Sequence, residues 1–272
     1  MASPTTITVS QLARLVGTPD CPTVLDLRTD VDFDDAPQLI PGARRHDFAD
    51  IAALVPALAG QRVVTYCQKG QKIGQGAAAM LRSFGIQAET LEGGHFGWRD
   101  AGQPMVTAAA IPAPYPTAPT LWVTRHRPKI DRIACPWLIR RFIDPGARFL
   151  FVEPAQVLPV AEKFAATPFD VEGVPFSHRD ENCTFDSMVV DFGLHTDALH
   201  RLALIIRGAD TNRHTLAPQS AGLLAASLGL SRMYRDDLEQ LDAGLQLYDA
   251  FYRWARDATD EGHDWPVPGP KA

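Results

Sequence analysis

The chain has 272 residues with 46% hydrophobic and 21% charged side chains, a balance typical of a globular protein long enough for two domains. Its formal net charge of -6 gives nucleic acids and anionic membranes no electrostatic reason to bind, so we expect neither as a partner. The four cysteines lie far apart without a CxxC pair, and no apolar run reaches the length of a membrane span. We therefore expect a cytoplasmic protein with reduced thiols.

A proline-rich segment between Met105 and Pro119 divides the chain. Its prolines deny the backbone both helical and central-strand hydrogen bonds, so this alanine- and proline-rich stretch is expected to be a linker. We predict a first domain over residues 1–106, a linker over residues 107–119 and a second domain over residues 120–272.

The first domain is expected to have an α/β fold. Short β-branched segments alternate with helical patterns, which predicts a parallel sheet flanked by helices. In the second helix, an apolar face is expected to pack on the sheet through Ala77, Met80, Leu81 and Phe84. We expect strands at residues 23–27, 62–66 and 87–91, and helices at residues 50–58 and 73–84.

The second domain is expected to be mostly helical, with an α+β arrangement. Pro136 leaves open a later start, at Cys135, for the first helix. An apolar stripe between Leu238 and Trp254 predicts a core face or the seam of a homodimer, and residues 260–272 are expected to form an arm outside the core. We expect strands at residues 121–124 and 147–153, and helices at residues 132–143, 184–192, 197–207, 218–228 and 231–256.

Cys67 stands where a β-branched run ends and a glycine-rich, basic loop opens into an alanine-rich helix. Backbone N–H groups around Gly70 and at the start of that helix, assisted by Lys69 and Lys72, would stabilise an anion at the sulfur. This pattern predicts a catalytic thiol that acts as a nucleophile. The alternative is a buried cysteine that only ends a strand.

The length of the loop after Cys67 argues against phosphatase chemistry. A tyrosine-phosphatase loop needs an arginine six residues after the cysteine to hold phosphate in a bidentate fork, and that position is Ile73. Lys72 closes a shorter loop, which suits a sulfur anion instead. The GxGxxA pattern at residues 74–79 begins inside the helix rather than at the strand end, so we expect no dinucleotide site there.

Three further segments resemble, in order, signatures of the rhodanese family: Val24-Leu-Asp-Leu-Arg28, Ile40-Pro-Gly-Ala43 and Leu91-Glu-Gly-Gly-His-Phe-Gly-Trp98. The resemblance covers residues 5–106. It implies that Cys67 takes sulfane sulfur from a small-molecule donor, holds it as a persulfide and passes it to a nucleophilic acceptor, with no cofactor required. It also implies a persulfide loop and anion-binding groups formed by Gln68, Lys69, Gly70, Gln71, Lys72 and Arg28.

Two positions of this resemblance have alternative interpretations. Arg28 either joins the hydrogen-bond network of the active site or forms a salt bridge that stabilises the strand end. Lys72 stands where the family usually has an arginine or a similar basic residue, and lysine offers a point charge without a bidentate fork, so the donor preference is open. His95 and Trp98 are interpreted as packing residues or pocket wall.

Polar residues in the second domain predict two further sites. Residues 124–144 contain five arginines and one lysine, which favours a local anion site for an oxyanion, with a capped surface helix as the alternative. Around residues 176–186, a histidine, a cysteine and several carboxylates could bind a divalent metal, with other acids brought in by folding. The alternative is a loop in which Asn182 or Thr184 caps a helix. The candidate metal ligands are His178, Cys183, Asp131, Asp186 and Asp210.

The segments Lys129-Ile-Asp-Arg-Ile-Ala134, Trp137-Leu-Ile-Arg-Arg-Phe-Ile-Asp144 and Arg148-Phe-Leu-Phe-Val152 resemble the C-terminal domain of chromate resistance proteins, a likeness that extends over residues 120–258. This resemblance implies a role in chromate sensing or detoxification. The leading hypothesis is a sulfurtransferase associated with chromate resistance, whose second domain receives the sulfur or binds an oxyanion or metal. The alternatives are a non-catalytic sensor of chromate or oxidants, and a metal-dependent enzyme seated in the second domain.

Overall fold

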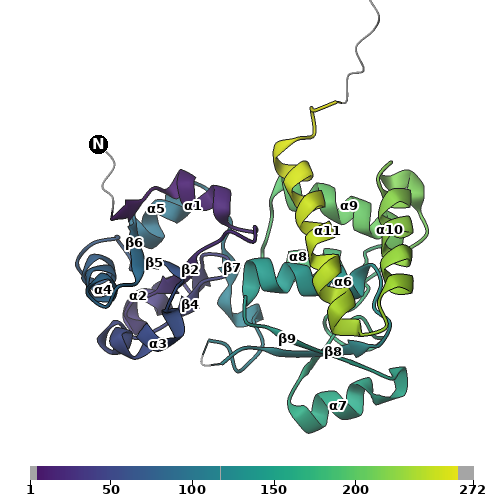
Figure 1. The fold of residues 1–272 in the computed structure, drawn as a ribbon, viewed down its shortest axis with the longest axis horizontal. Coiled ribbons are helices and arrows are strands. Elements are labelled where there is room, and N and C mark those ends of the chain that lie inside the picture. Colours follow the sequence, from purple (N-terminus) through teal and green to yellow (C-terminus); the bar gives the residue numbers. More distant parts are fainter. Residues whose placement is uncertain (1–4, 117, 263–272) are drawn as a thin grey trace, which may run out of the picture.

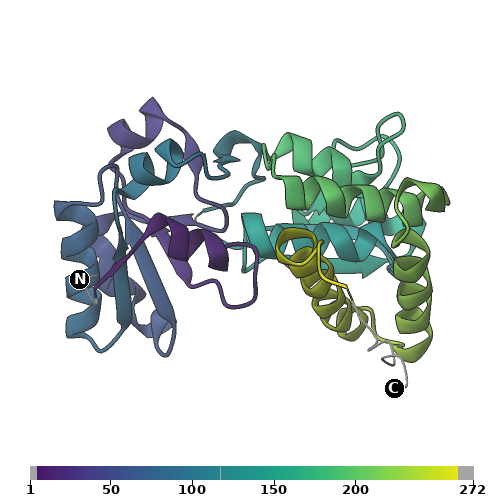
Figure 2. The same cartoon turned by 90° about the horizontal axis from the view of Figure 1, so that it is seen from above.

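The computed structural model describes residues 5–116, which we call the N-terminal lobe, and residues 118–262, the C-terminal lobe (Figures 1 and 2). The N-terminal lobe is built on a five-stranded sheet in which neighbouring strands are all parallel. The predicted parallel sheet is thereby confirmed. The strands lie in the order β1 (Thr6–Ile7), β6 (Gln87–Leu91), β5 (Arg62–Tyr66), β2 (Thr23–Asp26) and β4 (Arg44–Arg45).

Helices cover both faces of this sheet. Side chains alternate along β5, so Val63 joins one apolar core with α4, whereas Val64 joins another with α1 and α5. The predicted helix at residues 50–58 is a 3-10 helix, Phe48–Leu54, followed by the single turn of α3. The helices are α1 (Val9–Leu15), α2 (Asp30–Asp35), α3 (Val55–Leu58), α4 (Lys72–Ser83) and α5 (Gly94–Asp100).

Helix α4 packs on the sheet through small side chains. Met80 and Phe84 are 48% and 54% exposed, so the prediction that they pack on the sheet is wrong. Small residues on the buried face let the helix approach the strands closely, whereas larger side chains there would hold it away. The buried residues of α4 are Gly74, Ala77, Ala78 and Leu81.

The segment predicted as a linker is packed against the N-terminal lobe. Strand β3 (Gln38–Leu39) pairs antiparallel with β7 (Val106–Thr107), and a short 3-10 helix, Ala108–Ala110, follows. The hydroxyl of Tyr115 then donates a hydrogen bond to the carbonyl oxygen of Ala43. The connection between the lobes is therefore anchored at Val106–Thr107 and at Tyr115.

The C-terminal lobe contains a parallel sheet of three strands, in the order β10 (Thr167–Pro168), β8 (Leu121–Arg125) and β9 (Arg148–Val152). Helix α7 (Val157–Phe164) covers one face of this sheet, and the remaining helices gather on the other side (Figure 1). The sequence predicts neither β10 nor α7. The remaining helices are α6 (Asp131–Leu138), α8 (Thr184–Asp191), α9 (Asp197–Asp210), α10 (Ser220–Met233) and α11 (Asp237–Asp257).

Helix α6 starts at Asp131 and continues into a π-helical turn, Ile139–Ile143. Pro136 lies inside the helix, so the alternative start at Cys135 is wrong. Ile130 precedes the helix with a φ of 38°, a bend of the backbone that ends the incoming loop. Asp131 therefore occupies the first turn, where a carboxylate interacts favourably with the helix dipole.

The helix predicted over residues 231–256 is instead divided. Helix α10 continues to Met233, and α11 begins at Asp237 because the side chain of Asp236 accepts hydrogen bonds from the first backbone N–H groups. Among the helices of residues 5–116 and 118–262, none combines the length and apolarity needed to cross a membrane. Most of the predicted arm, residues 263–272, lies outside the described residues.

One buried apolar cluster runs through both lobes, joining Leu12 and Trp98 to Trp137 and Phe142. Gly17 is one point of close contact between the lobes. A Cβ atom there would overlap the aromatic rings of Phe142 and Tyr252, and the φ of 78° also disfavours any side chain. The relative arrangement of the lobes therefore depends on a glycine at this position.

The substitution Gly17→Ala is expected to lower the free energy of unfolding by about 2–4 kcal/mol, because it adds steric overlap to a left-handed backbone. Gly60→Ala is the matched control, since Gly60 has a φ of 75° but no heavy atom within 4 Å of the position that a Cβ atom would take. The control should lose only about 1 kcal/mol. Urea unfolding measures both, and equal losses would contradict a contribution from the contact between the lobes.

Candidate functional site

Cys67 follows the last residue of β5 and begins the loop that leads into α4. The residue is 6% exposed, and its Sγ atom lies 3.6 Å from the position that a Cβ atom on Gly74 would take. The first turn of α4 therefore contacts the thiol. No side chain caps that end of the helix, so its backbone N–H groups and the positive end of its dipole are directed toward the loop.

A second backbone segment, residues 93–96, closes over the cysteine loop. The N–H of His95 donates to the carbonyl of Cys67 at 2.9 Å, and the N–H of Phe96 donates to the carbonyl of Gln68 at 3.0 Å. Gly70 and Gly94 make this approach possible. Both have positive φ, and a Cβ on Gly70 would lie 2.7 Å from the nitrogen of Gly94. The Gly-Gly-His-Phe segment, a family signature in the sequence, thus holds the loop in place.

Apart from Arg28, the residues predicted to bind an anion form the loop itself. Gly70 is buried and Gln68 is half-buried, whereas Lys69, Gln71 and Lys72 are exposed. The two lysines can therefore attract an approaching anion, although solvent screens their charge. Their role at the site remains a prediction from the sequence.

Arg28 is held in a buried ion pair. Its guanidinium group donates to the carboxylate of Asp26 at 2.6 Å, with both side chains fully buried, and to the carbonyls of Ala36 and Gln38. The interpretation of Arg28 as a salt-bridge partner at the strand end matches these contacts. Its hydrogen bonds go to these groups and tie the segment before β3 to the end of β2, so the structure gives Arg28 no contact with the Cys67 loop.

His95 is the buried side chain next to this loop. It is 1% exposed, and neither ring nitrogen has a hydrogen-bond partner. Burial, and then the charge of the nearby Arg28 guanidinium, lower its pKa to about 4. The imidazole is therefore neutral at pH 7, which agrees with its interpretation as a packing residue.

A second group of polar side chains, which we call the polar cluster, lies in the C-terminal lobe. The Nε2 atom of His178 is 3.5 Å from carboxylate oxygens of Asp131 and Asp170, and 3.2 Å from Asp210. Three of the predicted metal ligands, His178, Asp131 and Asp210, are thus brought together. Atoms of His178, Asp131 and Asp170 that could bind one ion all lie within 4.8 Å of one another.

The acids of the polar cluster influence one another. Burial raises the pKa of Asp131 well above its usual range, and the charges of Asp210 and Asp170 raise it further. Hydrogen bonds to Asp170 and then to Asp210 raise the pKa of His178 to about 10. For Asp170, burial favours a raised pKa, but hydrogen bonds from His178 and Thr184 outweigh it and lower the pKa.

Cys183 and Asp186 do not join the group of atoms that could bind one ion. Cys183 is the N-cap residue of α8, and its backbone N–H donates to Asp186 at 3.1 Å. The predicted caps, Asn182 and Thr184, are therefore wrong. The carboxylate of Asp186 is also paired with Arg207 at 3.3 Å. Burial, and then the charge of Asp131, raise the pKa of the Cys183 thiol well above its usual range.

Asp170 is the member of the cluster that the sequence analysis misses. It lies after β10, a strand of two residues, and the parallel pairing of β10 with β8 brings it beside Arg125 at the same edge of the sheet. Arg132 contacts the same carboxylate at 3.3 Å. A carboxylate that follows a strand is a signal for a polar site at the edge of a sheet. The sequence does not reveal this one, because a strand of two residues has no periodicity from which to predict it.

The arginines of the basic segment at residues 124–144 are hydrogen-bonded to other groups of the protein. Each of these five arginines donates to a carboxylate or carbonyl of the chain, as in the pair of Arg141 with Asp249 at 2.7 Å. These hydrogen bonds account for the arginines within the fold, and the oxyanion site in this segment stays a prediction. The arginines connect helices and strands of the C-terminal lobe.

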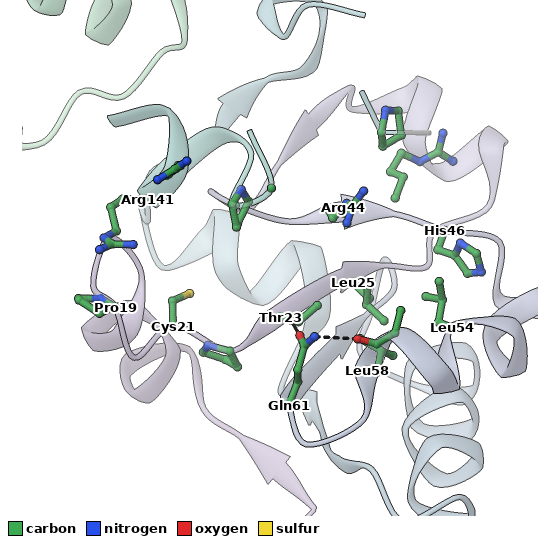
Figure 3. Close-up of a pocket in the computed structure, with 18 of the residues that line it drawn as sticks. Pro19, Cys21, Thr23, Leu25, Arg44, His46, Leu54, Leu58, Gln61 and Arg141 are labelled. Carbon is green, nitrogen blue, oxygen red and sulfur yellow. Dashed lines mark hydrogen bonds between the residues drawn. The ribbon is translucent and has the colours of Figure 1, made fainter. Parts of the chain in front are cut away.

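A cavity of about 760 Å³ lies between the lobes, away from both groups of residues described above. Figure 3 shows Leu25, Leu54 and Leu58 on one side of it, with Arg44 and Arg141 among the polar side chains. Of the described residues that line it, none belongs to the Cys67 loop or the polar cluster. The cavity therefore does not link the two.

Two known protein families match the chain, one within each lobe. Residues 8–101 match the family described as rhodanese-like domain, and residues 122–255 match the family described as ChrB, C-terminal domain. The first match includes Cys67 and the segment that closes over it. The second includes all four residues of the polar cluster.

One curated relative and two solved structures illustrate these similarities. Protein ChrB of Cupriavidus metallidurans is 34% identical over 154 residues, which are 56% of this chain and 46% of that protein, so the chain spans about half the length of this relative. A rhodanese-related protein from Thermoplasma volcanium is 20% identical, with a TM-score of 0.33, over 38% of this chain and 97% of that one. A thiosulfate sulfurtransferase from Pseudomonas aeruginosa is 26% identical, with a TM-score of 0.32, over 38% of this chain and 19% of that one.

The neutral state of His95 predicts a pH dependence of stability. In the unfolded chain a histidine has a pKa of about 6.5, so between about pH 6.5 and pH 4 the unfolded state binds the extra proton and is favoured. We expect this residue to cost about 2–3 kcal/mol of the free energy of unfolding as the pH falls from 7 to 4.5.

Urea unfolding at several pH values checks this expectation. His95→Gln should remove that part of the pH dependence, whereas His200→Gln, at an exposed position, should keep it. The assignment to His95 fails if both variants show the same loss of stability as the wild type between pH 7 and 4.5.

Proposed function

Because the chain joins a rhodanese-like domain to a ChrB C-terminal domain, we propose that it is a sulfurtransferase associated with chromate resistance, with Cys67 as its catalytic residue. The observation that carries the proposal is the closed loop at Cys67. Its backbone is held by residues 93–96, and its sulfur faces the uncapped start of α4. This arrangement favours negative charge on the sulfur, whether as thiolate or persulfide.

The proposed reaction has two steps, in which one sulfur atom passes from the donor to Cys67 and then from Cys67 to the acceptor. The thiolate of Cys67 attacks the outer sulfur of a donor such as thiosulfate, and the sulfur–sulfur bond of the donor breaks so that sulfite leaves with the electron pair. A nucleophile such as cyanide then attacks the outer sulfur of the persulfide. The second sulfur–sulfur bond breaks, thiocyanate leaves, and the thiolate of Cys67 is restored.

Burial of the thiol favours small reactants. Cys67 is 6% exposed, which leaves little room for a large donor or acceptor at the sulfur. Lys69 and Lys72 are exposed residues of the same loop, and their positive charge attracts an anionic donor. A small oxyanion of sulfur therefore fits this site better than a protein partner does.

The polar cluster is a poor candidate for the sulfur acceptor. Asp131 begins the helix formed by α6 and its π-helical extension, whereas Phe142, near the other end, contacts Gly17 of the N-terminal lobe. Eleven residues at 1.5 Å each separate these positions by about 16 Å. Helix α4 lies on the far side of the first sheet from the C-terminal lobe (Figures 1 and 2), which adds to the distance from Cys67. The two sites are therefore proposed to act separately.

The link to chromate resistance rests on the ChrB C-terminal match and on the relative named Protein ChrB. Chromate oxidises and depletes thiols, and a persulfide carrier supplies reduced sulfur under such conditions. The proposal therefore assigns sulfur transfer to the N-terminal lobe and the association with chromate stress to the C-terminal lobe.

Cys67→Ser is expected to reduce thiocyanate formation from thiosulfate and cyanide to the uncatalysed rate, because serine cannot form a persulfide. Mass spectrometry of the intact wild type, incubated with thiosulfate, should show the addition of one sulfur atom that is absent from Cys67→Ser. Cys21→Ser is the control, since Cys21 lies outside the loop and burial raises its pKa to about 11. The proposal is wrong if Cys67→Ser keeps the wild-type rate, or if the wild type with thiosulfate forms neither thiocyanate nor persulfide.

Lys72→Gln is expected to lower kcat/KM for thiosulfate by about 3–10-fold, because it removes one exposed positive charge beside the loop. The difference from the wild type should shrink at 1 M salt, where the Debye length is only about 3 Å. Lys163→Gln, which changes a lysine of α7 in the other lobe, is the matched control and should leave kcat/KM unchanged. A salt-independent loss in Lys72→Gln would contradict an electrostatic role.

A further inference from the structure

We propose that the polar cluster formed by Asp131, Asp170, His178 and Asp210 binds one divalent transition-metal ion. This inference concerns the C-terminal lobe alone and does not depend on sulfur transfer at Cys67. It assigns an ion to Asp131, Asp170 and His178, whose ligand atoms converge, with Asp210 beside His178.

The distances within the polar cluster fit the ligands of a single ion. Nitrogen and oxygen ligands bind Zn²⁺ at about 2.0–2.2 Å, so two ligands at a tetrahedral angle lie about 3.4 Å apart. The Nε2 atom of His178 lies 3.5, 3.5 and 3.2 Å from oxygens of Asp131, Asp170 and Asp210. These separations are close to the distance expected between two ligands of one ion. Ligand atoms of His178, Asp131 and Asp170 also lie within 4.8 Å of one another, so these three can share an ion, and Asp210 lies beside His178 outside that group of three.

Asp131 supplies an independent argument for a bound cation. The residue is fully buried, and its Oδ1 atom has no hydrogen-bond partner. Its Oδ2 atom accepts a hydrogen bond from the N–H of Thr184 at 2.6 Å, which fixes the carboxylate facing His178. A buried carboxylate oxygen without a partner is costly, and a metal ion bound by this carboxylate would remove much of that cost.

The charges around the polar cluster also favour a cation. Asp170 is paired with Arg125 at 2.9 Å and with Arg132 at 3.3 Å. Asp131 and Asp210, in contrast, face His178, and no arginine is paired with either of them among the described residues. Once an ion has displaced the proton of His178, the imidazole is neutral, and three carboxylates and two arginines leave a net charge of -1 for the ion to compensate. A divalent ion changes that to +1.

The ligand set indicates the class of metal. One imidazole nitrogen with carboxylate oxygens suits Zn²⁺, Mn²⁺ or Fe²⁺, whereas Mg²⁺ and Ca²⁺ prefer oxygen ligands alone. Thr184 also donates its hydroxyl to Asp170 at 2.9 Å, so two of the carboxylates are oriented from outside the cluster, as metal ligands commonly are.

The polar cluster is accessible on one side. The side chains of His178 and Asp210 are 44% and 20% exposed, whereas those of Asp131 and Asp170 are almost fully buried. An ion can therefore enter from the side of His178. Water or an anionic ligand could complete its coordination at that open side.

Metal content of the purified full-length chain tests the proposal. The protein carries Cys67→Ser to exclude binding by the loop thiol, is stripped with a chelator, is incubated with Zn²⁺, Mn²⁺ or Mg²⁺ in turn, and is then dialysed. Elemental analysis should find about one Zn²⁺ or Mn²⁺ per chain and no retained Mg²⁺. Titration calorimetry should show at least a tenfold weaker Kd for Zn²⁺ after His178→Ala or Asp210→Asn.

His126→Ala is the matched control, because His126 contacts Glu153 at 3.1 Å and is another histidine–carboxylate pair of the same lobe. It should bind the metal as the parent chain does. Circular dichroism establishes that each variant is folded, and Asp210→Asn keeps the shape of the side chain if His178→Ala does not fold. The proposal is overturned if the parent chain retains no Zn²⁺ or Mn²⁺, or if both variants bind Zn²⁺ as tightly as the control. Either result would indicate that a proton on His178 satisfies the acids instead.

Discussion

The close approach of two backbone segments, at Gly70 and Gly94, is the constraint on which the candidate active site depends. Two hydrogen bonds from residues 95 and 96 to the loop carbonyls require this separation, and no side chain fits between the segments. Once the loop is held, α4 can begin only beside Cys67, and its small buried residues let it lie close to the sheet. The reactivity expected of the thiol is thus a consequence of glycine positions and packing, and it needs no charged side chain in direct contact with the sulfur.

A shared apolar core fixes the relation between this site and the rest of the molecule. The cluster that includes Leu12 and Trp98 continues into Trp137 and Phe142, so the lobes are packed against each other rather than only tethered. Helix α6 starts at the polar cluster, and its extension ends at the contact with Gly17. The helix that joins the lobes therefore also separates their polar sites. Two kinds of chemistry can coexist in one chain because reactants at one site do not meet the other.

Local patterns predict the main elements of the N-terminal lobe, and long-range contacts explain the errors. The strands at residues 62–66 and 87–91 occur as predicted, because runs of β-branched or alternating residues end at clear breaks. The strands of only two residues have no periodicity and are missed. Met80 and Phe84 are predicted to be buried because they share a helix face with Ala77 and Leu81, but close packing of α4 requires the smaller residues to face the sheet.

The sequence also predicts the polar cluster only in part. The residue types predict His178, Asp131 and Asp210 as candidate ligands, whereas Asp170 becomes visible only when β10 pairs with β8. Cys183 and Asp186 have the right chemistry for ligands, but a capping interaction and an ion pair with Arg207 already use their polar atoms. The basic residues at 124–144 suggest an anion site, and their carboxylate and carbonyl partners show that these side chains also have a role within the fold.

The buried carboxylates of Asp26 and Asp131 differ in their hydrogen-bond and ion-pair partners, and this difference separates a structural role from a functional one. Asp26 is fully buried, but Arg28 neutralises it at 2.6 Å and uses its remaining donors on nearby carbonyls, so this charge is compensated within the fold. Asp131 is equally buried, yet one of its oxygens has no partner, and the neighbouring Asp170 and Asp210 are also acidic. Removing one partner of a buried pair typically costs about 3–5 kcal/mol, so an uncompensated buried carboxylate is a large burden for a domain of ordinary stability. The dipole of α6 and the N–H of Thr184 stabilise this carboxylate but leave its Oδ1 atom without a partner, and a cation bound by the polar cluster would compensate for that.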